Sequence, residues 1–296
     1  MSLISTLRFI TNHPLNNQQK LDAVFRFIKW QVGSRILPGT VAVNFVNDAR
    51  LLVSPGMTGA TGNIYTGLHE FEDMAFLLHV LRADDLFIDI GANVGSYTIL
   101  AGKVVGAKCI AIEPIPVTFN HLLDNISLNQ ISTKVVAHNL GIGRDTGILK
   151  FTTNLDTVNH VITDAEEGIE ILEVPVRSLD EIAGKLDPFL MKIDVEGFET
   201  DVVAGGEEVF SKTSLNAIIM ELNGSGSRYG YDEPSLHQKI IGYGFSPYSY
   251  LPVKRELVSL NGKNSESGNT LYIRDIKIAT DRIKSAPTFS VNKTEI

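Results

Sequence analysis

The fold of this chain is decided by residues 86–98, which read Leu86-Phe87-Ile88-Asp89-Ile90-Gly91-Ala92-Asn93-Val94-Gly95-Ser96-Tyr97-Thr98. A short apolar run containing one acidic residue is followed by two glycines in the pattern Gly-x-x-x-Gly. This pattern is typical of a parallel strand that turns directly into a helix above a bound nucleoside-like cofactor. Glycine permits the tight turn, and its missing Cβ lets a ligand approach the backbone.

The spacing of these glycines also indicates which cofactor to expect. A dinucleotide site prefers Gly-x-Gly-x-x-Gly, in which a pyrophosphate rests on the helix N-terminus. Asn93 stands here at the position of the middle glycine. S-adenosylmethionine carries a carboxylate, an amine and a sulfonium but no phosphate, so we predict this cofactor. A nicotinamide-dependent oxidoreductase is the alternative, and a strand-to-helix turn without a ligand remains open.

The next apolar run ends in a second acidic residue at a suitable distance. Residues 108–114 read Lys108-Cys109-Ile110-Ala111-Ile112-Glu113-Pro114, so that Glu113 follows Gly91 by roughly 20 residues. In a doubly wound sheet, an acid at this point accepts hydrogen bonds from ribose hydroxyls. Glu113 is therefore a candidate ribose-binding residue, although a carboxylate that caps the following helix would give the same pattern.

Composition limits the class of protein and its partners. The 296 residues suffice for one large α/β domain with additions, and 44% hydrophobic and 20% charged residues are ordinary for a globular protein. A formal charge of −8 argues against a nucleic-acid partner. The single cysteine, Cys109, is compatible with a reducing cytoplasm. We see neither a signal peptide nor a membrane span, and therefore expect a cytoplasmic protein without a membrane partner.

The chain divides by pattern into three segments. Residues 1–84 are expected to form a cap with helices at 16–32 and 71–81 and strands within 41–53. Residues 85–275 alternate strands and helices, as in a parallel sheet with crossover helices. Residues 276–296 form a polar tail, expected to be frayed from Lys284. The predicted strands are 86–90, 108–112, 134–138, 189–194 and 216–222, with an antiparallel insertion from 147–151 and 169–176 and a closing pair from 246–251 and 270–274. The predicted helices of this segment are 96–104, 117–128, 199–210 and 234–241.

A second group of carboxylates ends the fourth of these strands. Residues 190–199 read Leu190-Met191-Lys192-Ile193-Asp194-Val195-Glu196-Gly197-Phe198-Glu199. Ligands of open α/β sheets bind at the carboxyl ends of the strands, so Asp194 and Glu196 are expected in the cleft. Glu199 is equally explained as a residue of the first turn of the next helix, where the helix dipole favours a negative charge.

Taken together, these motifs resemble the FkbM family of S-adenosylmethionine-dependent methyltransferases. The resemblance rests on residues 88–95, Glu113-Pro114, Arg177-Ser178-Leu179-Asp180, residues 192–199 and Met220-Glu221, and it covers roughly residues 65–250. It implies a class I, Rossmann-like α/β fold with a seven-stranded, mostly parallel sheet. It also implies methyl transfer to oxygen, commonly a hydroxyl of a sugar or another natural product.

The resemblance further implies a set of cofactor-binding positions. Those on the loop after the first strand are Asp89, Gly91, Asn93, Gly95 and Ser96, and Glu113 falls on the ribose position. Gly141 and Asp145 are expected near adenine, with Asp145 as the nearest acidic candidate there. Glu70, next to His69, lies in a segment that the fold would place beside the cofactor, although the polar start of a helix explains this cluster as well.

Asp194 and Glu196 are the candidate general bases, because crowded carboxylates raise one another's pKa and a hydroxyl acceptor must lose its proton. Asp194, Glu196 and Glu221 also offer the oxygen ligands that Mg²⁺ or Ca²⁺ prefers, but their spacing does not establish a site, so no metal is predicted. The acceptor is expected to be a small molecule bound between the cap, residues 157–168 and the C-terminal loops. A nucleic-acid base methyltransferase and a cofactor-binding protein without activity are further alternatives, and the oligomeric state stays open.

Overall fold

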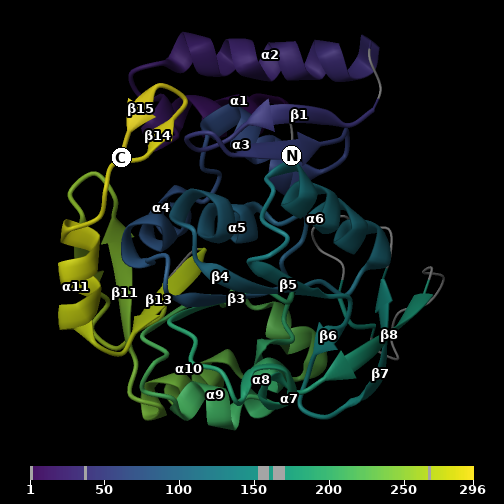
Figure 1. Cartoon of the computed structure of the whole chain (residues 1–296), viewed down its shortest axis with the longest axis vertical. Helices are drawn as coiled ribbons and strands as arrows, with labels where there is room; N and C mark the ends of the chain where they lie inside the picture. The colour runs from purple at the N-terminus through teal and green to yellow at the C-terminus, as the bar shows by residue number, and fades with distance from the viewer. Residues whose placement is uncertain (1–2, 37–38, 153–159, 163–170, 266–267) are drawn as a thin grey trace.

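The computed structural model describes the whole chain except residues 1–2, 37–38, 153–159, 163–170 and 266–267. Its centre is an eight-stranded sheet with the order β12-β11-β13-β10-β9-β3-β4-β5 (Figure 1). The strands are β12 (Glu256–Ser259), β11 (Ser246–Leu251), β13 (Asn269–Ile273), β10 (Ala217–Glu221), β9 (Leu190–Ile193), β3 (Leu86–Ile90), β4 (Lys108–Ile112) and β5 (Val135–His138). The five strands from β10 to β5 are parallel, which confirms the predicted α/β class with a mostly parallel sheet.

One strand more is present than the sequence predicts. β11 and β13 form the expected antiparallel pair at the closing edge, and β13 is also antiparallel to β10. β12 adds an eighth strand outside β11. β12 was not predicted from the sequence because only two of its four residues are apolar. It lies between a tight turn, in which the Arg255 amide donates to the Pro252 carbonyl, and a polar loop.

Helices cover both faces of the sheet (Figure 1). One face carries α4 (Phe71–Val80), α5 (Ser96–Ile99), its π-helical continuation η2 (Leu100–Val105) and α6 (Pro116–Leu128). The other carries α7 (Leu179–Ala183), α8 (Glu199–Ala204), α9 (Glu207–Ser211) and α10 (Glu233–Gly242). Because neighbouring side chains of a strand point to opposite faces, Phe87 joins the first hydrophobic cluster and Ile88 the second. Burial on both faces explains why these strands are apolar without alternation.

The helix predicted over 199–210 is divided into α8 and α9. Gly205 and Gly206 separate the two pieces. A Cβ on Gly205 would lie 2.1 Å from the Gly143 carbonyl oxygen, so the backbone passes too close to its neighbour for any side chain. Two consecutive glycines also disfavour a helix, so the break has a local signal that the prediction did not use, and the contact with Gly143 reinforces it.

A small second sheet follows β5, with the order β6-β8-β7. β7 (Gly147–Thr152) and β8 (Ile171–Arg177) are antiparallel, which confirms the predicted insertion. β6 (Gly141–Ile142) adds a parallel strand that was not predicted. Of the predicted acceptor segment 157–168, only residues 160–162 lie within the described residues.

The N-terminal segment forms an additional layer over α4, α5 and α6 (Figure 1). It consists of α1 (Leu3–Asn12), the 3-10 turn η1 (Pro14–Asn16), α2 (Lys20–Ile36), β1 (Val41–Asn44), β2 (Arg50–Val53) and α3 (Thr58–Thr66). The predicted helix at 16–32 thus begins and ends four residues later, while α1 and α3 were not predicted. Among the residues described, no helix is both long enough and apolar enough to cross a bilayer.

The expectation of a frayed C-terminus is wrong. α11 (Ile276–Lys284) is followed by a hairpin of β14 (Ser290–Val291) and β15 (Thr294–Glu295). Phe289 and Val291 are buried in it, and Val291 forms a bridge with Val46 of the N-terminal segment. Side chains from all three predicted segments share one hydrophobic cluster, so the boundaries at 84 and 275 run through a continuous core.

Candidate functional site

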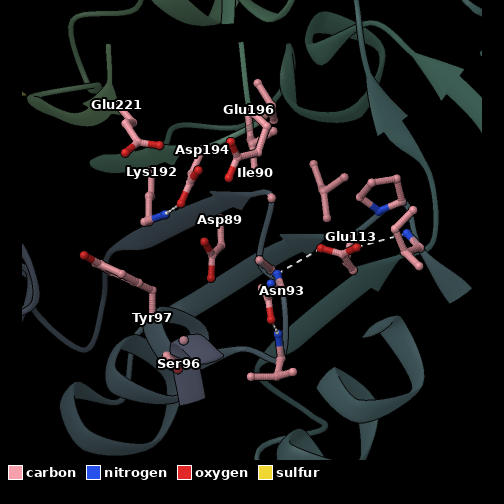
Figure 2. Close-up of a pocket in the computed structure, with 18 of the residues that line it drawn as sticks. Asp89, Ile90, Asn93, Ser96, Tyr97, Glu113, Lys192, Asp194, Glu196 and Glu221 are labelled. Atoms are coloured by element: carbon pink, nitrogen blue, oxygen red, sulfur yellow. Dashed lines mark hydrogen bonds and ion pairs between the residues drawn. The ribbon is translucent and has the colours of Figure 1, made fainter. Parts of the chain in front are cut away.

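A cavity of about 360 Å³ opens at the carboxyl ends of the central parallel strands (Figure 2). This volume lies within the usual range of small-molecule sites. Nine of the eleven predicted site residues line it: Glu70, Asp89, Gly91, Asn93, Ser96, Glu113, Gly141, Asp194 and Glu196. Gly95 is not in the lining but starts α5 in the left-handed conformation. Asp145 is exposed in the turn between β6 and β7, away from the cavity, so the structure does not bring it to the others.

Gly91 is the point where the turn after β3 meets the end of β9. Its φ is 80°, and a Cβ would lie only 1.8 Å from the Asp194 carbonyl oxygen. The Asp194 amide donates to the Ile90 carbonyl at 3.0 Å, which fixes the same junction. Glycine is therefore required to place the turn after β3 against the residues that follow β9.

Glu113 closes the turn from the neighbouring strand (Figure 2). Its two carboxylate oxygens accept hydrogen bonds from the backbone amides of Asn93 and Ile115, each at 3.0 Å. Burial nevertheless raises the pKa of Glu113 to about 7. The Asn93 side chain accepts from the Val94 amide at 2.7 Å and so stabilises its own left-handed turn. Glu113 thus presents a carboxylate with remaining lone pairs at the end of β4.

Lys192 is a buried cation that the sequence analysis did not single out as a site residue. Its ammonium lies 2.6 Å from Asp194 Oδ2 and 4.8 Å from the centroid of the Tyr97 ring. Burial acts to lower the pKa of Lys192, but the carboxylates of Asp194, Glu70 and Asp89 outweigh it, and the pKa rises. The sequence did contain a signal for this role, because a lysine inside an otherwise apolar, buried strand requires an acidic or polar partner.

Asp89, the second-last residue of β3, lies beneath this pair (Figure 2). It is buried and accepts a hydrogen bond from the Thr98 hydroxyl at 2.6 Å. Burial raises its pKa to about 6, against the opposing effect of Lys192. Asp89 therefore ties the start of α5 to β3 while its carboxyl group faces the cavity.

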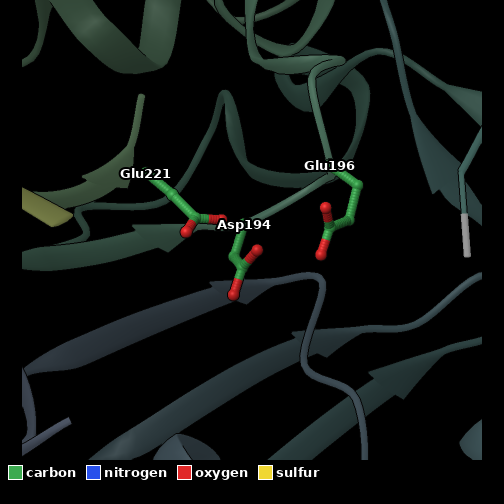
Figure 3. Close-up of side chains that lie close together, drawn as sticks. All are labelled: Asp194, Glu196 and Glu221. Atoms are coloured by element: carbon green, nitrogen blue, oxygen red, sulfur yellow. The ribbon is translucent and has the colours of Figure 1, made fainter. Parts of the chain in front are cut away.

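Three half-buried carboxylates gather at the other side of the opening (Figure 3). One oxygen from each of Asp194, Glu196 and Glu221 lies within 4.8 Å of the others. Burial, together with the charges of Asp194 and Glu221, raises the pKa of Glu196 to about 7. Burial and then Asp194 raise the pKa of Glu221 as well. Such a group can take a proton from a hydroxyl, and its oxygens are also of the type that a divalent cation prefers.

Glu199 has a structural position instead. Its Oε1 accepts from the amides of Val195 and Gly197, each at 3.2 Å, so it shapes the loop that carries Glu196. Glu196 itself has a φ of 54°, which is uncommon for a residue with a side chain. The left-handed turn aims Glu196 toward Asp194 (Figure 3).

The remaining walls are of two kinds. Beyond Glu113 the lining is largely apolar, with Ile115, Leu140, Ile142, Phe151 and Val161 beside Gly141. The opposite wall comes from α3 of the N-terminal layer, where Asn63 donates to the Ser96 hydroxyl at 3.2 Å and accepts from the His69 amide at 2.8 Å. Glu70 accepts from the Asn269 side chain at 3.1 Å. No local pattern in the sequence placed α3 here, because its role depends on tertiary packing.

Comparisons with known proteins identify the family of the chain. The family model for the methyltransferase FkbM domain matches residues 89–247. A protein named methyltransferase 1 from Beauveria bassiana is 30% identical over 219 residues, which cover 66% of this chain and 87% of that protein. The hexuronic acid methyltransferase AglP of Haloferax volcanii is 26% identical over 155 residues, 52% of this chain and 62% of that protein.

Solved structures resemble the chain at lower similarity. The crystal structure of M. jannaschii TYW2 in complex with AdoMet has 12% sequence identity and a TM-score of 0.41, over 81% of this chain and 88% of that one. The family match spans more than half of the sequence and begins at Asp89, the buried acid of the cavity. With its motifs assembled around one cleft, the chain belongs to the FkbM family of methyltransferases.

Proposed function

We propose that this protein transfers the methyl group of S-adenosylmethionine to a hydroxyl oxygen of a small molecule. The observation that carries the choice of cofactor is the charge of the cavity. Its lining contains six carboxylates, Glu70, Asp89, Glu113, Asp194, Glu196 and Glu221, and one lysine, Lys192. A sulfonium and an ammonium group suit such a lining, whereas the pyrophosphate of a nicotinamide cofactor would be repelled.

The residues present fit this cofactor in three parts. Glu113 offers carboxylate oxygens for ribose hydroxyls at the end of β4. The apolar wall around Ile115 and Phe151 suits the faces of an adenine ring. The loop from Gly91 to Ser96 and the Lys192 ammonium are suited to bind an amino-acid carboxylate, and Asp89 lies in the same lining.

The bound cofactor would supply an electrophilic methyl group, and the chain would supply alignment and a base. The acceptor hydroxyl has to lose its proton as the new oxygen–carbon bond forms and the sulfur–carbon bond breaks. Asp194 and Glu196 lie together at the mouth of the cavity, and the raised pKa of Glu196 suits it for accepting that proton near neutral pH. The Lys192 ammonium holds the Asp194 carboxylate in one orientation.

The acceptor class is inferred from the same carboxylates and from the relatives. Carboxylate oxygens accept hydrogen bonds from neighbouring hydroxyls, as carbohydrates and polyols provide. The relative AglP is named for hexuronic acid, which supports a sugar hydroxyl. A formal charge of −8 and the acidic mouth oppose a nucleic-acid acceptor.

Calorimetric titration with S-adenosylhomocysteine and, in parallel, with NAD tests the cofactor. We expect micromolar binding of the first and none of the second, and binding of NAD alone would overturn the assignment. A panel of sugars, uronic acids and polyols with methyl-labelled S-adenosylmethionine then tests the acceptor. The Asp194→Asn variant should bind S-adenosylhomocysteine within about twofold of wild type and transfer at least ~10²-fold more slowly.

A further inference from the structure

Helix α2 lies in the outermost layer of the molecule (Figure 1), and it carries a stripe of exposed apolar side chains. The stripe is formed by Leu21, Phe25, Ile28, Val32 and Ile36, whose exposed fractions are 86%, 66%, 50%, 51% and 70%. Their spacing of three or four residues puts all five on one side of the helix. Monomeric proteins rarely expose a contiguous row of large apolar side chains, so such a row marks a contact surface.

The fold does not need this side of α2. The opposite side is the one that packs, with Ala23 and Phe27 buried. The Phe27 ring meets that of Tyr65 on α3 at 5.2 Å between centroids. α2 is thus apolar on two sides, and among the described residues only one of these sides is buried.

The charge around the stripe differs from that of the rest of the protein. Residues 1–36 contain five basic residues, Arg8, Lys20, Arg26, Lys29 and Arg35, and one acid, Asp22. This gives a formal charge of +4 in a chain whose total is −8, so the other 260 residues carry −12. At 100° per residue, Lys29 and Arg35 flank the stripe on its two sides, and both are exposed.

We propose that this surface docks the protein on an anionic lipid bilayer, with α2 lying parallel to the membrane plane. A helix with apolar residues toward the lipid and flanking lysine and arginine residues binds at the level of the headgroups.

The same charges decide against a second copy of this chain as the occupant. Two-fold pairing of the stripes would bring two layers of +4 together, whereas an anionic surface complements them. No membrane partner is predicted from the sequence, because it contains no membrane-spanning segment. A helix that lies on the surface of a bilayer requires no such segment. The proposal is independent of methyl transfer, since the stripe lies outside the catalytic cavity.

Vesicle co-sedimentation tests the proposal directly. The full chain is mixed with vesicles of phosphatidylcholine alone, or with vesicles of phosphatidylcholine that contain about 30% phosphatidylglycerol. We expect binding to the anionic vesicles only, lost at high salt. The variant Phe25→Ser/Ile28→Ser should bind at least ~10-fold more weakly. Lys29→Gln/Arg35→Gln should lose on the order of fivefold for each charge. The matched control is Val253→Ser, an apolar residue that is 83% exposed far from α2 in the sequence.

Two further readouts separate docking from misfolding and from self-association. Trp30, the only tryptophan, packs on the inner side of α2, so unchanged fluorescence shows that the variants keep the helix in place. A fluorescent probe on Ile28→Cys should shift to the blue with anionic vesicles, because Cys109, the only native cysteine, is buried and will not label. Equal binding to both vesicle types, no binding, or a dimer that dissociates in Phe25→Ser/Ile28→Ser would overturn the proposal.

Discussion

The ammonium of Lys192 lies 2.6 Å from the carboxylate of Asp194, two residues further along the chain where β9 ends. Lys192 is 4% exposed at its side chain, whereas Asp194 is 29% exposed and reaches the mouth of the cavity. The pair therefore connects the buried floor, where Asp89 lies, to the group of three carboxylates at the opening. Lys192 thus provides a positive charge within the acidic site.

Replacing Lys192 with Met should lower kcat at least ~10-fold and move the acidic limb of the pH profile to higher pH. Without the ammonium, the charged forms of Asp89 and Glu221 lose its stabilisation, so the pKa values of these two carboxyl groups rise. Steady-state kinetics between pH 5 and 9 measure both effects, and S-adenosylhomocysteine binding reports whether the cavity survives. Lys103→Met is the control, because Lys103 pairs only with the exposed Asp48 at the surface. An unshifted pH profile in Lys192→Met would contradict this role.

Glu196 should set the acidic limb of kcat/KM. A general base works in its deprotonated form, and the raised pKa of Glu196, about 7, means that activity falls about tenfold for each pH unit below that value. Glu196→Gln should remove this limb and reduce the rate. Glu221→Gln should move the limb to lower pH, since one of the charges that raise the pKa of Glu196 is gone. If the limb stays near pH 7 in Glu196→Gln, another carboxylate is the base.

Glu113→Gln should weaken S-adenosylhomocysteine binding at least ~10-fold. In the variant, the NH2 of glutamine replaces one of the two carboxylate oxygens that accept from the Asn93 and Ile115 amides. The hydrogen bonds to ribose also become weaker, because the side chain is no longer charged. Calorimetry measures the change. Asp145→Asn is the matched carboxylate control, expected to bind as wild type because Asp145 lies outside the cavity. An equal loss in both variants would place part of the cofactor near Asp145.

Gly91→Ala should lower the free energy of unfolding by at least ~2 kcal/mol. Its φ of 80° disfavours a side chain, and the new Cβ would meet the Asp194 carbonyl oxygen. Gly147→Ala is the control, because a Cβ there meets nothing within 4 Å. Urea unfolding of both variants followed by circular dichroism measures the difference. Equal stability of the two would show that the junction of β3 and β9 can relax.

Local patterns predicted the central sheet well. Strands β3, β4 and β9 are largely apolar runs with one charged residue each, and their short-range signal is strong because burial on both faces leaves no alternation to misread. The same runs predicted that Asp89, Glu113 and Asp194 meet at one edge, since parallel strands end together. The extra strand β12 pairs with its neighbour β11 and the helix break falls at Gly205 and Gly206, so both had local signals that the prediction did not use. The packing of the C-terminal hairpin was not predictable, because Val291 forms a bridge with the distant Val46.

By itself, the sequence determined the strand-turn-helix unit at residues 86–98, the acids at the ends of the parallel strands and the family resemblance. These are local properties of spacing and residue type. Only the tertiary structure decided that Lys192 pairs with Asp194, that α3 forms a wall of the cavity, that Asp145 stays outside it and that the stripe of α2 is left uncovered. The physical reason is that burial and charge pairing are set by which distant segments come into contact, and neither is written in the residues nearby.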